Sequence, residues 1–132
     1  MIEPRFIPTS FTLAGQKAPS VDVERFRSDL READIEEMVD TLLATFLEDS
    51  PERLTALEHA VERGDAPEIE SAAHAFKSGA GTIRATHLAE LLRLAENGAR
   101  NGEPDSSGLL EQVRVEYAAV RRQLEAALSG EG

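Results

Sequence analysis

The chain has 132 residues, the length of one ordinary domain, and can bury a hydrophobic core without disulfides or metal ions. Its 25 acidic and 14 basic residues leave a formal net charge of −11, which argues against direct binding to nucleic acid or anionic lipid, because both require a cationic face. Cysteine is absent, so disulfides, Cys-ligated metals and thiol catalysis are excluded.

The N-terminal segment differs in character from the rest of the chain. Residues 1–20 contain Pro4, Pro8 and Pro19 and lack the continuous apolar core of a signal peptide. No stretch of about 18 consecutive apolar residues occurs anywhere, so we expect no insertion into a membrane. These features predict a cytoplasmic protein with a flexible arm or linker over residues 1–20 and one domain over residues 21–129.

From Ser20 onward the pattern has the 3.6-residue period of α-helices. A short helix is expected near residues 22–31. Asp34 is followed three residues later by a glutamate, the spacing of a capping box, which predicts the start of the next helix. Apolar periodicity then continues across Pro51, so residues 34–63 can form either one kinked helix or two.

A second capping box begins at Asp65, with Pro67 in the first turn of the helix that it predicts. Gly64, directly before it, is suited to ending the preceding helix. The sequence therefore predicts a short connection between two helices at this point.

Two further helices are expected, one from about Thr86 to Gly98 or Gly102 and one from Asp105 to about Leu128. Both carry apolar residues at intervals of three and four, typical of a helix with one buried face. Short connections favour antiparallel neighbours. We therefore predict an all-α fold, an up-and-down four-helix bundle with a short additional N-terminal helix.

The segment 65–85 carries the strongest functional signal. On a helix its apolar side chains gather on one side, the expected core face: Ile69, Ala72, Phe76, Ala80 and Ile83. His74 lies roughly opposite this face and is expected to be exposed, with Lys77 one turn further on. Polar or small residues surround it: Glu70, Ser71, Ser78 and Gly81.

Two glycines lie inside this helix, where each costs about 1 kcal/mol relative to alanine. Gly79 faces the core side and is expected to let a neighbouring helix approach. Gly81 lies on the face of His74, where the missing side chain leaves room for the backbone of another protein. An exposed imidazole beside a cation, with little bulk around it, suits transfer of a group between two macromolecules.

Other interpretations of His74 carry less weight or stay open. An exposed histidine is often only a polar surface residue, and spacing alone does not decide against this. A metal site is disfavoured, because His59, His74 and His87 form no i,i+4 pair and Glu70 with His74 supplies only two ligands. Hydrolase and nucleotide-binding functions lack their glycine-rich loop or supported nucleophile.

Residues 74–88, HAFKSGAGTIRATHL, resemble the signature of histidine-containing phosphotransfer (HPt) domains of multistep phosphorelays. The resemblance implies that His74 is the phosphoacceptor and that Lys77 assists at the phosphoryl group. Small residues at three positions would let a receiver domain dock: Ser78, Gly79 and Gly81.

The resemblance also bears on two residues outside this core. Glu96 stands where some relatives, including the phosphotransfer domain of chemotaxis kinases, carry an acidic partner for the imidazole. Arg84 stands where the family usually has glycine in a turn, and it is expected to contact the partner or the phosphoryl group. The expected partner-binding residues are Glu70, Ser71, Ser78, Gly81 and Arg84.

The resemblance implies a phosphocarrier that is not itself an enzyme. His74 would accept a phosphoryl group from a receiver-domain aspartate and pass it to another, using an imidazole whose ordinary pKa is about 6.5. Receiver domains of response regulators or hybrid histidine kinases would be the partners and would supply Mg²⁺, so we expect a monomer with no cofactor or metal of its own. The alternative is a helical adaptor whose His74 is never phosphorylated.

Overall fold

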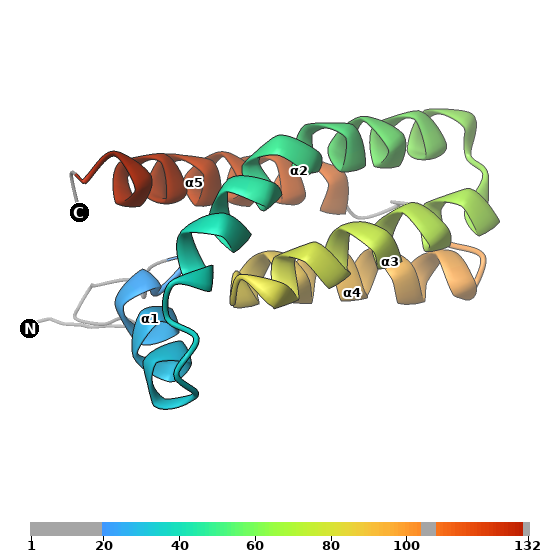
Figure 1. The fold of residues 1–132 in the computed structure, drawn as a ribbon. Helices are drawn as coiled ribbons and strands as arrows, with labels where there is room; N and C mark the ends of the chain where they lie inside the picture. Colours follow the sequence, from blue (N-terminus) through green and yellow to red (C-terminus); the bar gives the residue numbers. More distant parts are fainter. Residues whose placement is uncertain (1–19, 104–107, 131–132) are drawn as a thin grey trace, which may run out of the picture.

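The computed structural model describes residues 20–103 and 108–130, and this part of the chain is built from five α-helices (Figure 1). They are α1 (Val23–Glu32), α2 (Met38–Arg63), α3 (Ala66–Thr82), α4 (Thr86–Arg100) and α5 (Leu109–Ser129). Helices α2 to α5 alternate in direction along the bundle, and α1 lies at one end of it. The predicted all-α up-and-down bundle with a short N-terminal helix is confirmed.

The four long helices enclose one apolar core. Helices α2 and α4 each pack against both α3 and α5, which closes the bundle. Phe46 of α2, Phe76 of α3 and Tyr117 of α5 pack together within the core, with ring centroids 5.6 to 6.5 Å apart. Tilted and edge-to-face contacts of this kind stabilise a core beyond the apolar area that they bury.

Helix α1 packs against α2 near the end of the bundle at which α3 turns into α4 (Figure 1). Phe26 of α1 is buried there, and the guanidinium of Arg84 in that turn lies 5.3 Å from the centre of its ring. The backbone N–H of Val21 donates a hydrogen bond of 2.9 Å to the side chain of Gln123 in α5. Contacts to α2, α5 and the α3–α4 turn thus hold α1 to the bundle.

Helix α2 is continuous from Met38 to Arg63 and bends along its length, so one kinked helix occupies this part of the chain (Figure 1). Pro51 lies inside it and has no N–H to donate to the carbonyl of Leu47, one turn earlier. Nη1 of Arg121 in α5 donates to that carbonyl at 3.4 Å. A side chain from a neighbouring helix therefore replaces the hydrogen bond that the proline removes.

The predicted capping box at Asp34 is wrong. Asp34 has a φ of 65°, in the left-handed region, and directly follows Ala33, the C-cap residue of α1. The N–H of Ile35 donates to the carbonyl of Leu30 at 2.8 Å, the hydrogen bond typical of a Schellman motif. Asp34 therefore ends α1, and α2 begins only at Met38.

The predicted connection before α3 is confirmed. The carboxylate of Asp65 accepts a hydrogen bond of 3.2 Å from the backbone N–H of Glu68, and Gly64 has a φ of 63°, as the end of a helix requires. Pro67 lies in the first turn of α3, where its missing N–H leaves no hydrogen bond unmade.

The ends of the remaining helices differ in part from the prediction. Helix α4 begins at Thr86 as expected and continues to Arg100, so Gly98 lies inside it. Helix α5 begins at Leu109 with Gly108 as its N-cap residue, later than the predicted start at Asp105. Asp105 itself lies outside the described residues, as do residues 1–19 of the predicted arm. None of the described helices is long and apolar enough to cross a membrane.

Candidate functional site

Helix α3 buries one face in the core and exposes the opposite one. Its buried residues are Ile69, Ala73, Phe76 and Ala80. Ala72, which was expected in this set, is only partly buried because the true centre of the buried face lies closer to Ala73. The side chain of His74 is 65% exposed, so its predicted position on the outer face is confirmed.

A buried carboxylate from α4 meets the imidazole. Glu96 is only 7% exposed, and its Oε2 lies 3.0 Å from Nδ1 of His74. Its other oxygen, Oε1, accepts a hydrogen bond of 2.6 Å from Nζ of Lys77. The structure therefore brings together three of the residues singled out in the sequence, from two helices.

This geometry determines which imidazole nitrogen carries the proton. An ionised carboxylate can only accept hydrogen bonds, so Nδ1 of His74 must be the donor to Glu96. In the neutral imidazole the other nitrogen, Nε2, then keeps a free lone pair. The exposed side chain thus offers Nε2 as a nucleophile, oriented by the hydrogen bond at Nδ1.

Arg100 is a further residue of this site, and the sequence reasoning missed it. Its Nη2 donates to Oε2 of Glu96 at 3.1 Å, and its Nε donates to Glu70 at 2.9 Å. Glu96 and Arg100 are four residues apart on α4, a spacing that allows an ion pair on one helix face. That spacing was the available signal, but only the fold shows that the pair lies beside His74.

The cations around Glu96 favour its ionised form. The hydrogen bond from Lys77, assisted by that from His74, holds the pKa of the Glu96 carboxyl below its usual range, although burial acts in the opposite direction. Arg100 stays charged, because its hydrogen bond with Glu70 raises its pKa further. The site therefore contains a fixed negative charge beneath the imidazole.

The residues expected to face a partner lie around His74 on the same side. Glu70, Ser71, His74 and Glu96 line one shallow hollow together with Pro67. Ser78 and Gly81 are exposed, and a Cβ added at Gly81 would have no atom within 4 Å. The open surface at Gly81 that the sequence predicted is thus present.

Gly79 faces α2, as expected. A Cβ added to Gly79 would lie 3.6 Å from the ring of Phe46, an ordinary van der Waals contact. The glycine therefore allows close packing, but the space would also admit an alanine.

Arg84 contacts its own chain. It has a φ of 66°, in the left-handed region that favours glycine, and the N–H of Ala85 donates to the carbonyl of Ala80 at 2.9 Å, so the α3–α4 turn holds an arginine in a left-handed conformation. Its guanidinium lies over Phe26 and 3.9 Å from Asp29, both in α1. These contacts hold α1 against the bundle, and the structure does not bring Arg84 into the group around Glu96.

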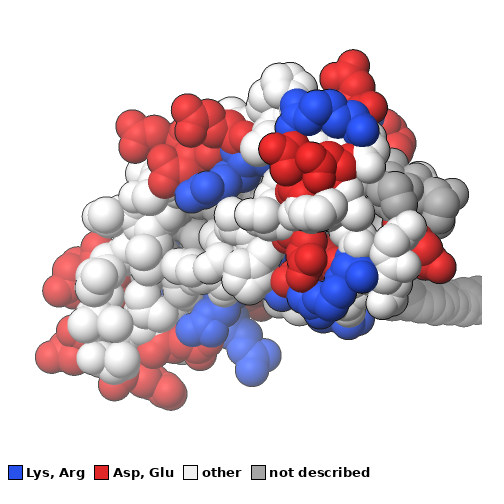
Figure 2. All heavy atoms as spheres, turned by 90° about the vertical axis from the view of Figure 1, so that its right-hand side faces the viewer, with Lys and Arg blue, Asp and Glu red and all other residues white. Residues whose placement is uncertain are grey.

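The charged surface carries both signs. On the end of the bundle shown in Figure 2, Lys and Arg side chains lie among Asp and Glu side chains and form no broad cationic face. Among the described residues, no three His, Cys, Asp or Glu side chains are grouped so as to hold a metal ion.

An antiparallel helical bundle that exposes one oriented histidine, with a lysine and a buried carboxylate beside it, has the features of a phosphotransfer module. The family model of the Hpt domain matches residues 41–129. The chain therefore belongs to the Hpt domain family, whose members are phosphotransfer intermediates and not kinases, and pass phosphoryl groups to receiver domains.

A solved structure agrees with this assignment. The chain is similar to the histidine-containing phosphotransfer protein B (HptB) of Pseudomonas aeruginosa PAO1, with 36% sequence identity and a TM-score of 0.75. The match covers 86% of this chain and 97% of that one. A comparison with curated proteins gave no match. Family and structure together support a role as a phosphorelay phosphocarrier.

Proposed function

We propose that this protein carries a phosphoryl group on Nε2 of His74, taking it from the aspartate of one receiver domain and passing it to the aspartate of another. The observation that supports this most directly is the pairing of an exposed imidazole with a buried carboxylate, in which Glu96 holds Nδ1 and leaves Nε2 free.

In the proposed step, the lone pair of Nε2 attacks the phosphorus of a receiver aspartyl phosphate in line. The N–P bond forms as the bond between phosphorus and the aspartate oxygen breaks, and the receiver carboxylate leaves with the bonding electrons. The ring, still protonated at Nδ1, gains positive charge, which the carboxylate of Glu96 offsets from 3.0 Å away. Transfer to the second receiver is the reverse of this step.

Two cations have separate roles in the proposal. Lys77 is one turn from His74, and its ammonium would turn from Glu96 to the phosphoryl oxygens once these are present. Arg100 would remain on Glu96 and keep that carboxylate ionised and in place while Lys77 moves. In this scheme Lys77 contacts the transferred group, whereas Glu96 and Arg100 are positioning residues.

The proposal is tested by incubating the protein with receiver domains charged with radiolabelled acetyl phosphate and Mg²⁺. The expected product is an acid-labile, alkali-stable phosphoprotein that loses its label to a second receiver. His74→Gln should abolish labelling without changing the circular dichroism spectrum, whereas His59→Gln and His87→Gln should be labelled normally. A wild-type protein that binds receivers but is never labelled would instead be an adaptor, and labelled His74→Gln would place the phosphoryl group elsewhere.

A further inference from the structure

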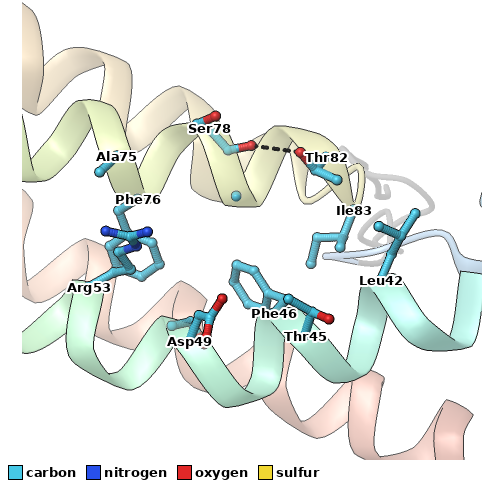
Figure 3. Close-up of a pocket in the computed structure, with 12 residues that line it drawn as sticks. Leu42, Thr45, Phe46, Asp49, Arg53, Ala75, Phe76, Ser78, Thr82 and Ile83 are labelled. Atoms are coloured by element: carbon cyan, nitrogen blue, oxygen red, sulfur yellow. Dashed lines mark hydrogen bonds between the residues drawn. The ribbon is translucent and has the colours of Figure 1, made fainter.

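A groove lies between α2 and α3 (Figure 3). It has a volume of about 250 Å³. Phe46 and Phe76 line it from the two helices, and Gly79 contributes no side chain. The groove therefore offers an apolar surface that is partly open to solvent.

Two side chains of opposite charge line this groove. Asp49 and Arg53 lie one turn apart on α2, are exposed, and extend toward α3 in Figure 3. Their i,i+4 spacing would allow them to pair with each other. Yet no side-chain hydrogen bond or ion pair joins either of them to any residue that the structure describes, in contrast to Arg100 and Arg114, whose side chains bridge helices.

The groove is continuous with the surface around His74. Two of the residues that line the groove are close to His74 on α3: Ala75 directly follows it, and Ser78 lies one turn further on. A turn of helix rises only about 5.4 Å. Because Ser78 lies one turn from His74 on the same face of α3, a globular domain that brings an aspartyl phosphate to Nε2 of His74 would also reach the mouth of the groove.

We propose that Asp49 and Arg53 determine which receiver domains this protein accepts. This role rests on the proposed phosphocarrier function. It adds to the contact at His74 a second contact between the receiver and the groove. The receiver that fits presents an apolar side chain to the groove, flanked by a basic group that meets Asp49 and an acidic group that meets Arg53. A receiver with the reversed arrangement would place like charges together and be rejected.

The test compares two charge reversals that change the net charge equally. Arg53→Glu alters the groove, whereas Arg122→Glu alters an exposed arginine of α5 that does not line it and pairs with no described residue. Each variant is mixed with a panel of phosphorylated receiver domains, and kcat/KM of transfer to His74 is measured at low and high salt. For the preferred receiver, we expect Arg53→Glu to lower kcat/KM about tenfold at low salt, and less at high salt, because electrostatic steering is screened by ions.

Further variants separate docking from folding. Asp49→Arg combined with Arg53→Asp keeps the net charge and should change the rank order of receivers in the panel. Arg53→Gln removes the charge without reversal and serves if Arg53→Glu lowers the unfolding temperature. Circular dichroism of every variant should match that of the wild type.

The outcomes distinguish this inference from the proposed function. In one outcome the wild type is phosphorylated, and every groove variant has the same kcat/KM as Arg122→Glu with every receiver. The specificity role of Asp49 and Arg53 is then wrong, and the phosphocarrier function stands. If no receiver phosphorylates the wild type, the proposed function fails and this inference fails with it.

Discussion

At the residue scale, the site depends on the carboxylate of Glu96, which accepts hydrogen bonds from three other side chains. His74, Lys77 and Arg100 all contact it within 3.1 Å, and it is nearly inaccessible to solvent. A buried carboxylate would be costly by itself, and these partners offset that cost. The same contacts that stabilise the charge also orient the imidazole and hold Lys77 close to it.

Lys77→Ala tests the proposed contact with the phosphoryl group. A hydrogen bond to a charged group contributes about 1.5 to 3 kcal/mol, so we expect transfer to slow by about tenfold or more. Glu96 would keep Arg100 as a partner, and the fold should persist. Rates of transfer and of phosphohistidine hydrolysis measure the effect, with Arg93→Ala on α4 as the control. If neither rate changes, Lys77 has no role at the phosphoryl group.

Glu96 should also make the stability of the bundle depend on pH. Because Lys77 holds the pKa of Glu96 low in the folded state, this stabilisation is fully present above the unfolded carboxyl pKa of about 4.3 and is lost as the pH falls through the lower folded value. Glu96→Gln lacks the contribution at every pH. The difference in Tm between wild type and variant should therefore shrink from about pH 6 to about pH 3. A difference that stays constant would contradict the ion-pair assignment.

At the element scale, α3 combines a tightly packed face with an outer face that is left open at Gly81. A Cβ there would meet nothing within 4 Å, so packing does not explain the glycine. The groove beside it is lined by the same helix. We infer that the outer face of α3 lacks a side chain at Gly81 so that another domain can approach His74 closely.

Gly81→Ala should therefore stabilise the protein by up to about 1 kcal/mol, the difference in helix propensity. Gly81→Gln should also fold, because its side chain extends into solvent, but should weaken receiver binding and transfer without touching His74. Thermal unfolding and receiver affinity, measured on both variants, test the two effects. Normal receiver binding by Gly81→Gln would show that this part of α3 does not face the partner. If Gly81→Gln unfolds instead, the fold does not tolerate a side chain at this position, and the glycine has a structural role.

At the scale of the whole molecule, a buried polar cluster joins α2 to α5 at the kink. Ser50, next to Pro51, is 1% exposed, and its hydroxyl lies 2.7 Å from that of Tyr117. Arg121 donates both to Tyr117, at 3.1 Å, and to the carbonyl that Pro51 leaves free. The direction of the second half of α2 thus depends on contacts with a helix from the other end of the chain.

Tyr117→Phe should destabilise the fold by about 1 to 3 kcal/mol, because the buried Ser50 hydroxyl loses its partner. Adding Ser50→Ala removes that unpaired group. The double variant should therefore lose less unfolding free energy than the two single variants lose in sum. Denaturant unfolding of the four proteins measures this difference. Strict additivity would show that the two hydroxyls contribute independently.

Much of the fold follows from short-range rules that the sequence satisfies by itself. The capping side chain of Asp65, the left-handed Gly64 and the apolar period of α3 involve residues only a few positions apart, so they locate the helix and expose His74 without knowledge of the other helices. Asp34 shows the limit of such rules. Its residue type suits both a helix start and a left-handed helix end, and the backbone hydrogen bond from Ile35 to Leu30 selects the second.

Tertiary structure decided the rest of the site. Glu96 is 22 residues from His74, and only the packing of α4 on α3 brings its carboxylate to Nδ1. The same packing brings Arg100 to Glu70. The sequence determined which side chains carry the chemistry, because residue type and helical period are local properties. Their partners depend on how the helices pack, because contacts between distant residues form only when the core between them is buried.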